Sequence, residues 1–270
     1  MDYNLKYKKY YLGGNEIMNK KFIKFFVLSA SLFFSFSLFD QSASAMTNEI
    51  QENVTQPTTV QSEAEKEQVN KKLELVDQYI KSKPKNLSRS YGSNVTVLFA
   101  TCVQKYGTYC GPGAAYNATN AANSQDVFAK SLQTGPNGTA FPGNWAGTLN
   151  AWRPGNDYKC LSVPGGRYDT IFNWKKKLLD CIIYTIDNSY PVVADCHITT
   201  NSNTRIHPGY SYARDTWHYV TVGGYNDYAN SDNSKILISD SHPSTSTIPR
   251  TYWTSLPKLA YATIDRGIVW

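Results

Sequence analysis

Apolar residues recur at helical spacing in two segments of the chain. The first stripe consists of Val69, Leu73, Val76 and Ile80, with Glu and Lys between its members. It predicts a helix with one buried face that ends at the following proline. The second stripe lies in residues 169–187 and predicts another helix with one apolar face.

Short runs rich in β-branched residues predict the strands. Four runs of this kind are residues 94–101, 191–198, 218–223 and 235–240. A further short helix is expected directly after Cys110, where Gly111-Pro112 opens a run of Ala and Asn residues. Because helices come first and antiparallel strands follow, the order of elements predicts an α+β fold.

The first 45 residues have the pattern of an export signal. Residues 25–39 carry no charge, follow three lysines and lead to Ala43-Ser44-Ala45, which predicts a signal peptide cleaved after Ala45. The apolar run spans about 15 residues, fewer than the about 20 that a membrane-spanning helix needs. Residues 1–17 are interpreted as an upstream extension. An uncleaved anchor is the alternative.

Composition divides the remaining chain into two parts. Residues 46–61 are mostly Thr, Gln, Asn, Glu and Pro, which predicts a flexible tail. Together with the first helix this tail forms segment 46–89, which is either a pro-segment or the start of the domain. Residues 90–270 are rich in Gly, Tyr and Trp and are expected to form the main domain.

The overall composition is that of a globular protein with a sizeable core. Of the 270 residues, 41% are hydrophobic and 18% are charged, which excludes disordered and fibrous classes. The net charge of +6 falls to +3 without residues 1–45, and no basic cluster indicates a nucleic-acid partner. No other segment approaches membrane-spanning length. The histidines form no HExxH motif and the cysteines no paired CxxC motif, so neither a metal nor another cofactor is expected.

Cys110 is the candidate nucleophile. Five cysteines in an exported chain leave at least one thiol unpaired, and the expected helix start at Cys110 favours a thiolate. The alternative is an inert, buried cysteine. Packing or disulfides are expected for the other four, without a unique connectivity, although Cys181 and Cys196 would make a plausible pair. These four are Cys102, Cys160, Cys181 and Cys196.

His218 has the neighbourhood of a catalytic base. It opens the strand HYVTVGGY, and the strand KILISD ends in Asp240. If these strands form a hairpin centred at Ala229, His218 and Asp240 face each other closely enough for the carboxylate to orient the imidazole. Asp215 is the rival orienting residue. A surface hydrogen bond of His218 is the alternative to catalysis.

Acyl transfer also needs donors for a developing oxyanion. The backbone N–H of Cys110 is one candidate. Gln104, six residues earlier in QKYGTYC, is another, because a glycine-containing turn could fold its amide toward the thiol.

These motifs together resemble the papain-like superfamily and specifically the C39-like peptidases. The order Gln104, Cys110, His218 and Asp240 matches that family, and the resemblance spans residues 91–270. It implies a papain-like α+β fold with Cys110 as nucleophile, His218 as base, Asp240 as orienting residue and Gln104 in the oxyanion hole. The chain differs from the C39 peptidases of bacteriocin exporters, which are fused to membrane-spanning and ATPase modules, because it has no GxxxxGK[ST] loop. The substrate of those exporters therefore cannot be transferred to this chain.

The resulting hypothesis is a secreted or wall-associated cysteine peptidase or amide hydrolase that acts on a peptide or protein through a Cys110 thioester. A cell-wall amidase or endopeptidase of the Cys-His type is a second enzymatic interpretation. A catalytically silent binding module, suggested by the aromatic-rich surface, is the third.

The export hypothesis predicts the N-terminus of the secreted protein. N-terminal sequencing of secreted material should begin near Met46, because cleavage is expected after the small residues that end at Ala45. Material that begins at Met18, or that retains residues 25–39 in a membrane fraction, would contradict the predicted cleavage.

Overall fold

The computed structural model describes residues 56–83, 93–163, 168, 170–212, 215–226 and 232–270. The predicted signal peptide with its upstream extension, residues 46–55 of the predicted tail and the turn at Ala229 lie outside these residues. The chain divides into two units, Met1–Ala43 and Ser44–Trp270, and every described residue belongs to the second.

The described part of the chain contains helices and an antiparallel sheet. The α-helices are α1 (Glu63–Ser82), α2 (Cys110–Ala118), α3 (Gln125–Ser131), α4 (Trp145–Trp152), α5 (Ile171–Asp187) and α6 (Leu256–Thr263). The strands are β1 (Asn94–Thr96), β2 (Cys160–Ser162), β3 (Val192–Thr199), β4 (Asp215–Asn226), β5 (Lys235–Ser239), β6 (Thr251–Ser255) and β7 (Gly267–Val269). Two short 3₁₀ helices, η1 (Ser202–Thr204) and η2 (Pro208–Tyr212), precede β4.

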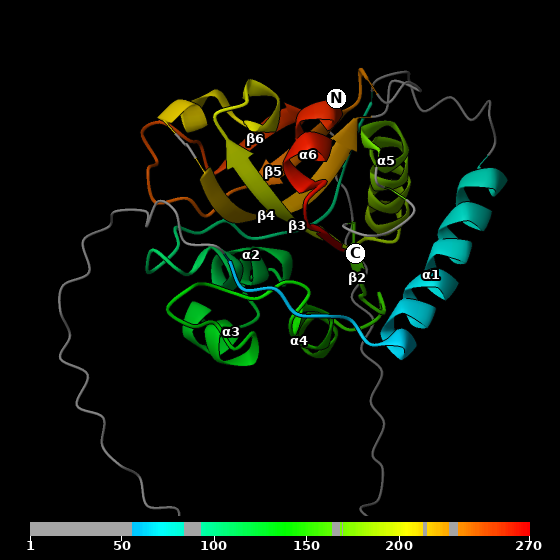
Figure 1. Ribbon diagram of the computed structural model, residues 1–270, viewed down its shortest axis with the longest axis horizontal. Coiled ribbons are helices and arrows are strands. Elements are labelled where there is room, and N and C mark those ends of the chain that lie inside the picture. The colour runs from blue at the N-terminus through cyan, green and yellow to red at the C-terminus, as the bar shows by residue number, and fades with distance from the viewer. Residues whose placement is uncertain (1–55, 84–92, 164–167, 169, 213–214, 227–231) are drawn as a thin grey trace, which may run out of the picture. The chain divides into compact units, whose positions relative to one another are not determined.

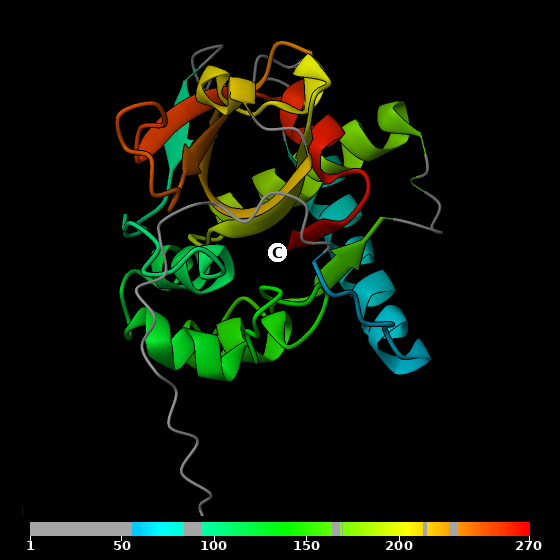
Figure 2. The ribbon, with the colours of Figure 1, turned by 60° about the vertical axis from the view of Figure 1, so that its left-hand side comes forward.

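The sheet runs in the order β2-β7-β3-β4-β5-β6, and β1 also pairs with β4. All of these pairings are antiparallel. Helices α2, α3 and α4 lie together below the sheet (Figure 1) and pack on it around Trp145 and Tyr219. Helices α1, α5 and α6 contribute to a second apolar cluster with the strands, built around Trp174 and Ile182, and Figure 2 shows the strong curvature of the strands between the two groups of helices. The predicted α+β class is confirmed.

The helical stripes correctly predicted α1 and α5, and α2 begins at Cys110 as expected. The first predicted strand is shorter than residues 94–101, since β1 ends at Thr96. Beyond it, the backbone N–H of Ala100 donates to the carbonyl of Asn117 in α2. After β1 the chain turns from β4 toward α2, since Val97 still donates to Gly223 while Ala100 donates to Asn117.

The predicted register, with His218 opposite Asp240, is wrong. Strands β4 and β5 pair Thr221 with Ser239, and the register shifts at a bulge further along β4. Continued past Ser239, this pairing sets Asp240 opposite Val220, two residues from His218. Diagonal neighbours of this kind share one face of a sheet and remain within reach of long side chains. The contact between the two residues therefore forms through a different geometry from the predicted one.

Helix α1 is packed into the domain. Ser62 and Glu65 form a capping box at its start, and Leu73 and Val76 are buried in the apolar cluster shared with α5. The Lys72 ammonium is also buried and donates to the carbonyl oxygens of three residues; they are Asn156, Asp157 and Trp270. Burial lowers the pKa of Lys72 to about 7. No helix in the described ranges is long and apolar enough to cross a membrane.

A matched pair of substitutions tests whether α1 is part of the fold. Leu73→Ala should lower the free energy of unfolding by about 2–5 kcal/mol, because it leaves a cavity under the helix. Leu75→Ala, at a position that is 52% exposed, should change it by about 0.5 kcal/mol or less. Urea denaturation measures both. Equal, small losses would show that α1 contributes little to the stability of the domain.

Candidate active site

Cys110 is the first residue of α2, and small residues bring it close to the end of β5. A Cβ atom added to Gly111 would lie 2.1 Å from Thr139 Oγ1, and one added to Gly113 would lie 2.6 Å from Ser241 Oγ. Glycine is therefore required for this close packing of the helix. The first turn of α2 directs its free N–H groups toward the same region as the thiol. Cys110 itself is 5% exposed.

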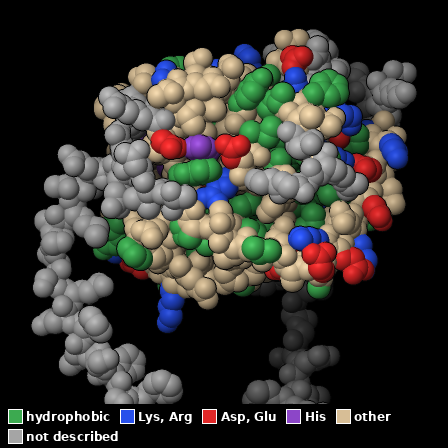
Figure 3. Space-filling model, viewed as in Figure 1, with side chains coloured by type: hydrophobic (Ala, Val, Ile, Leu, Met, Phe, Trp, Pro, Cys, Tyr) green, Lys and Arg blue, Asp and Glu red, His purple; other side chains and the backbone are tan. Residues whose placement is uncertain are grey.

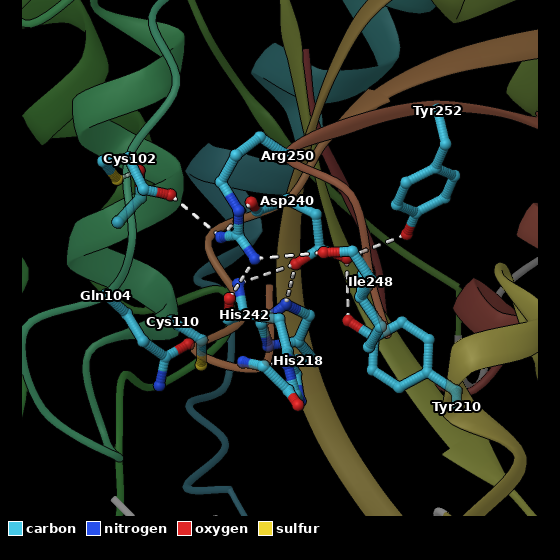
Figure 4. A network of polar contacts seen from close by, with 12 residues as sticks. Cys102, Gln104, Cys110, Tyr210, His218, Asp240, His242, Ile248, Arg250 and Tyr252 are labelled. Atoms are coloured by element: carbon cyan, nitrogen blue, oxygen red, sulfur yellow. Dashed lines mark hydrogen bonds and ion pairs between the residues drawn. The ribbon is translucent and has the colours of Figure 1, made fainter. Parts of the chain in front are cut away.

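Asp240 follows β5 and is fully buried, yet four hydrogen bonds satisfy its carboxylate (Figure 4). His218 Nε2 at 2.8 Å and the backbone N–H of His242 at 2.9 Å share Oδ1. The hydroxyls of Tyr210 and Tyr252 each donate to Oδ2 at 2.8 Å. Burial favours the neutral acid, but the charge and hydrogen bond of His218, with the other donors, hold the pKa of Asp240 well below its usual range.

His218 is 4% exposed and uses Nε2 for Asp240, which leaves Nδ1 for Cys110. Burial of the ring opposes its positive charge, but the attraction and hydrogen bond of Asp240 outweigh burial and raise the pKa of His218 to about 10. Hydrogen bonding with the Cys110 thiol raises this pKa further. The two side chains lie next to each other in Figure 4. The arrangement thus places an imidazolium beside the sulfur of Cys110 at a helix start.

Arg250 fixes the backbone that carries Asp240. Its guanidinium donates to the carbonyl oxygens of Asp240 at 2.7 Å, Cys102 at 3.1 Å and His242. Burial and the charge of His218 lower the pKa of His242 to about 4, so His242 is neutral at physiological pH. The sequence analysis did not identify Arg250, Tyr210 or Tyr252, because no local motif distinguishes them from other arginines and tyrosines.

Gln104 lies near Cys110, but its amide is oriented differently from the prediction. Its Nε2 donates to the carbonyl oxygens of Tyr106 at 3.0 Å and Gly107 at 2.8 Å. Its buried Oε1 has no hydrogen-bond partner and points toward Cys110 in Figure 4. In this state the amide hydrogens are donated to carbonyl oxygens of the loop and are not available to an oxyanion above the thiol.

Asp215, the alternative orienting residue, hydrogen-bonds a different histidine. One face of the molecule shows a histidine between two acidic side chains (Figure 3); His197 bonds Asp215 through Nε2 and Asp265 through Nδ1. The Trp217 ring stacks on the His197 ring with 3.8 Å between centroids. Asp215 therefore belongs to a separate cluster, and Asp240 is the carboxylate at His218.

All five cysteines are free thiols, so the suggested Cys181–Cys196 disulfide is absent. Burial raises the pKa of Cys102 and of Cys160 to about 12, and it also raises those of Cys181 and Cys196. These four thiols are therefore neutral near pH 7. Within the described ranges no group of three or more His, Cys, Asp or Glu side chains could hold a metal ion.

A double-mutant cycle tests the network around Asp240. Tyr252→Phe removes one donor to the charged carboxylate and should lower the free energy of unfolding by about 1.5–3 kcal/mol. In an Asp240→Asn background the same change should cost clearly less, because the acceptor has lost its charge. Chemical denaturation measures the four proteins. Additive losses would contradict the network, and Tyr261→Phe, a partly exposed control, should have no effect.

Comparisons with known proteins identify the family of this chain. A search of curated proteins finds no match. Among solved structures, the chain is similar to UfSP from C. elegans at 12% identity and a TM-score of 0.35, over 71% of this chain. The match spans only 35% of the length of that protein. The model of the Peptidase_C39 like family matches residues 96–264, a span that includes Gln104, Cys110, His218 and Asp240. The chain therefore belongs to the Peptidase_C39 like family.

Proposed function

We propose that the chain is a cysteine peptidase that cleaves peptide bonds through a Cys110 thioester, with His218 as general base. The observation that supports this most strongly is the buried Asp240 carboxylate, which orients His218 beside a thiol at a helix start. This combination supplies a nucleophile, a base and a residue that orients the base. Membership of a peptidase family makes a peptide or protein the expected substrate.

In the proposed reaction, the proton of Cys110 is already held by His218, which its raised pKa keeps as an imidazolium, and the Cys110 sulfur attacks the carbonyl carbon of the substrate. The tetrahedral oxyanion then collapses, the C–N bond breaks and the His218 imidazolium gives its proton to the leaving amine. Water attacks the resulting thioester while His218 accepts a proton. Collapse of the second tetrahedral intermediate breaks the C–S bond and releases a carboxylic acid. Asp240 keeps the imidazole in one orientation throughout both steps.

We assign the first oxyanion donor to the backbone N–H of Cys110, because amides at a helix start are aligned before the reaction begins. Gln104 is proposed as the second donor. For this role its amide must release the carbonyl oxygens of Tyr106 and Gly107 and turn its nitrogen toward the substrate oxygen. Substrate binding would then supply the acceptor that the loop provides in the free protein.

We further propose that the enzyme acts outside the cell. This proposal rests on the uncharged run 25–39 and the small residues that end at Ala45.

Prolonged incubation with an unfolded protein substrate tests the proposed activity. Mass spectrometry should find pairs of fragments whose masses add up to the substrate plus one water. Cys110→Ala should abolish cleavage, and His218→Ala should slow it by about 10²–10⁴-fold. Cys102→Ala is the matched control, because its thiol is neutral near pH 7, and it should retain activity.

Three results would contradict the proposal. Peptide cleavage by Cys110→Ala would show that Cys110 is not the nucleophile. Loss of activity in Cys102→Ala without unfolding would move that assignment to Cys102. Hydrolysis of side-chain amides with an intact substrate chain would exclude peptide-bond cleavage.

A further inference from the structure

Residues 56–61, which we call the strap, run across the candidate active site before α1 begins. The strap is the blue segment that passes α2 and α4 on its way to α1 in Figure 1. The sequence analysis expected a flexible tail here. In the structure, both ends of the strap and its centre are bound to the domain.

The first strap residue covers the nucleophile. The side-chain amide of Gln56 donates from Nε2 to Cys110 Sγ at 3.7 Å, and Gln56 is only 5% exposed. A substrate carbonyl would have to occupy the same space above the thiol. The contact between the Gln56 amide nitrogen and Sγ therefore blocks the approach of a substrate to Cys110.

The centre of the strap pairs with the main chain of Phe141. The N–H of Phe141 donates to the carbonyl of Pro57, and the N–H of Thr59 donates to the carbonyl of Phe141, both at 3.1 Å. These bonds form a parallel bridge between Thr58 and Phe141. Pairing of this kind uses only backbone groups, so another extended peptide can form it equally well.

A buried arginine binds the main chain of the strap beside the thiol. Arg266 donates to the carbonyl oxygen of Gln56 at 2.9 Å and is 4% exposed. Its Nε lies 3.5 Å from the carboxylate of the fully buried Asp195, and its guanidinium lies 4.1 Å from the centre of the Trp217 ring. When the strap leaves, this guanidinium is free to donate to another main-chain carbonyl oxygen at the same place.

The far end of the strap is anchored by the fold. Gln61 donates to the carbonyl of Cys160 at 2.9 Å, and α1 follows directly, with Lys72 and its apolar face buried. Anchoring keeps the strap at a high effective concentration over the cleft. Residues 57–60 are nevertheless exposed, and Val60 is 93% exposed, so another peptidase can reach this stretch.

We propose that the strap keeps the chain self-inhibited by filling the groove for an extended peptide substrate, and that Phe141 and Arg266 bind the substrate main chain in its place. This inference rests on the proposed peptidase function. Activation is hydrolysis of a peptide bond in the exposed part of the strap by another peptidase: water adds across the C–N bond and yields a carboxylic acid and an amine. The released piece then dissociates, while α1 stays in the domain.

A controlled cut tests the strap. The recognition sequence of a sequence-specific protease is inserted between Val60 and Gln61 of the full chain, and the same protein is studied uncut and cut. The cut should accelerate alkylation of Cys110 by iodoacetamide about 10²-fold or more, as expected for loss of a tethered ligand. Peptide hydrolysis should rise in parallel, and thermal melting should show that the domain remains folded.

A synthetic peptide tests the groove without altering the protein. The peptide of residues 46–61 should inhibit the cut enzyme and slow its alkylation. A second peptide, in which the carbonyl between Gln56 and Pro57 is reduced to a methylene, lacks the acceptor for Arg266. It should bind about tenfold more weakly or worse, as expected for loss of a hydrogen bond to a charged group.

The outcomes separate the two proposals. Unchanged alkylation after the cut would overturn self-inhibition, whatever the hydrolysis assay shows. Faster alkylation without hydrolysis of any peptide would support the strap and overturn the peptidase function. Equal inhibition by the two peptides would overturn the role of Arg266.

Discussion

The buried charge of Asp240 is the constraint on which the site depends. An ionised carboxylate without water is strongly destabilising unless donors satisfy it. Here two tyrosine hydroxyls, one backbone N–H and one imidazole do so. Tyr210 and Tyr252 come from η2 and β6, so several elements of the domain must be in place before the carboxylate is stable. The same set of bonds fixes the orientation of His218.

The electrostatics of the site follow from this arrangement. Asp240 raises the pKa of His218 and thereby stabilises an imidazolium beside Cys110. The charge of His218 in turn helps to lower the pKa of the neighbouring His242, so a single positive imidazole is stable there at neutral pH. Arg250 donates to backbone carbonyl oxygens. The carboxylate of Asp240 is therefore bound by other groups, among them His218 and the two tyrosines. The stable positive charge is thus on the ring of His218, which lies beside Cys110.

The sequence predicted the elements better than their pairing. Helical stripes located α1 and α5, because burial of one face determines residue spacing. The β4–β5 register depends on a bulge next to Gly223, where an added Cβ would lie 2.1 Å from Phe99 Cε1. The Gly223-Gly224 pair inside the strand is a local signal of a bulge, but it does not give the size of the register shift. The contact between His218 and Asp240 was predicted correctly because the bulge and the shifted turn leave both on one face.

Two further differences come from contacts that the residue pattern does not predict. The composition of residues 46–61 predicted a tail that could not fold by itself, but part of it contacts Cys110, Phe141 and Arg266. Gln104 was expected to donate toward the thiol, but two loop carbonyl oxygens lie close enough to bind its amide. The partners of residues 56–61 are distant in sequence. The partners of Gln104 are near in sequence, but their contact depends on the conformation of the loop.

The protonation state of the His218 ring tests the central claim most directly. Nuclear magnetic resonance of histidine-labelled protein at about pH 8 should show His218 as an imidazolium, whereas a histidine with the ordinary pKa of about 6.5 is neutral there. In Asp240→Asn the ring should be neutral at the same pH, because the charge that stabilises the imidazolium has been removed. A His218 ring that titrates near pH 6.5 in both proteins would contradict the account.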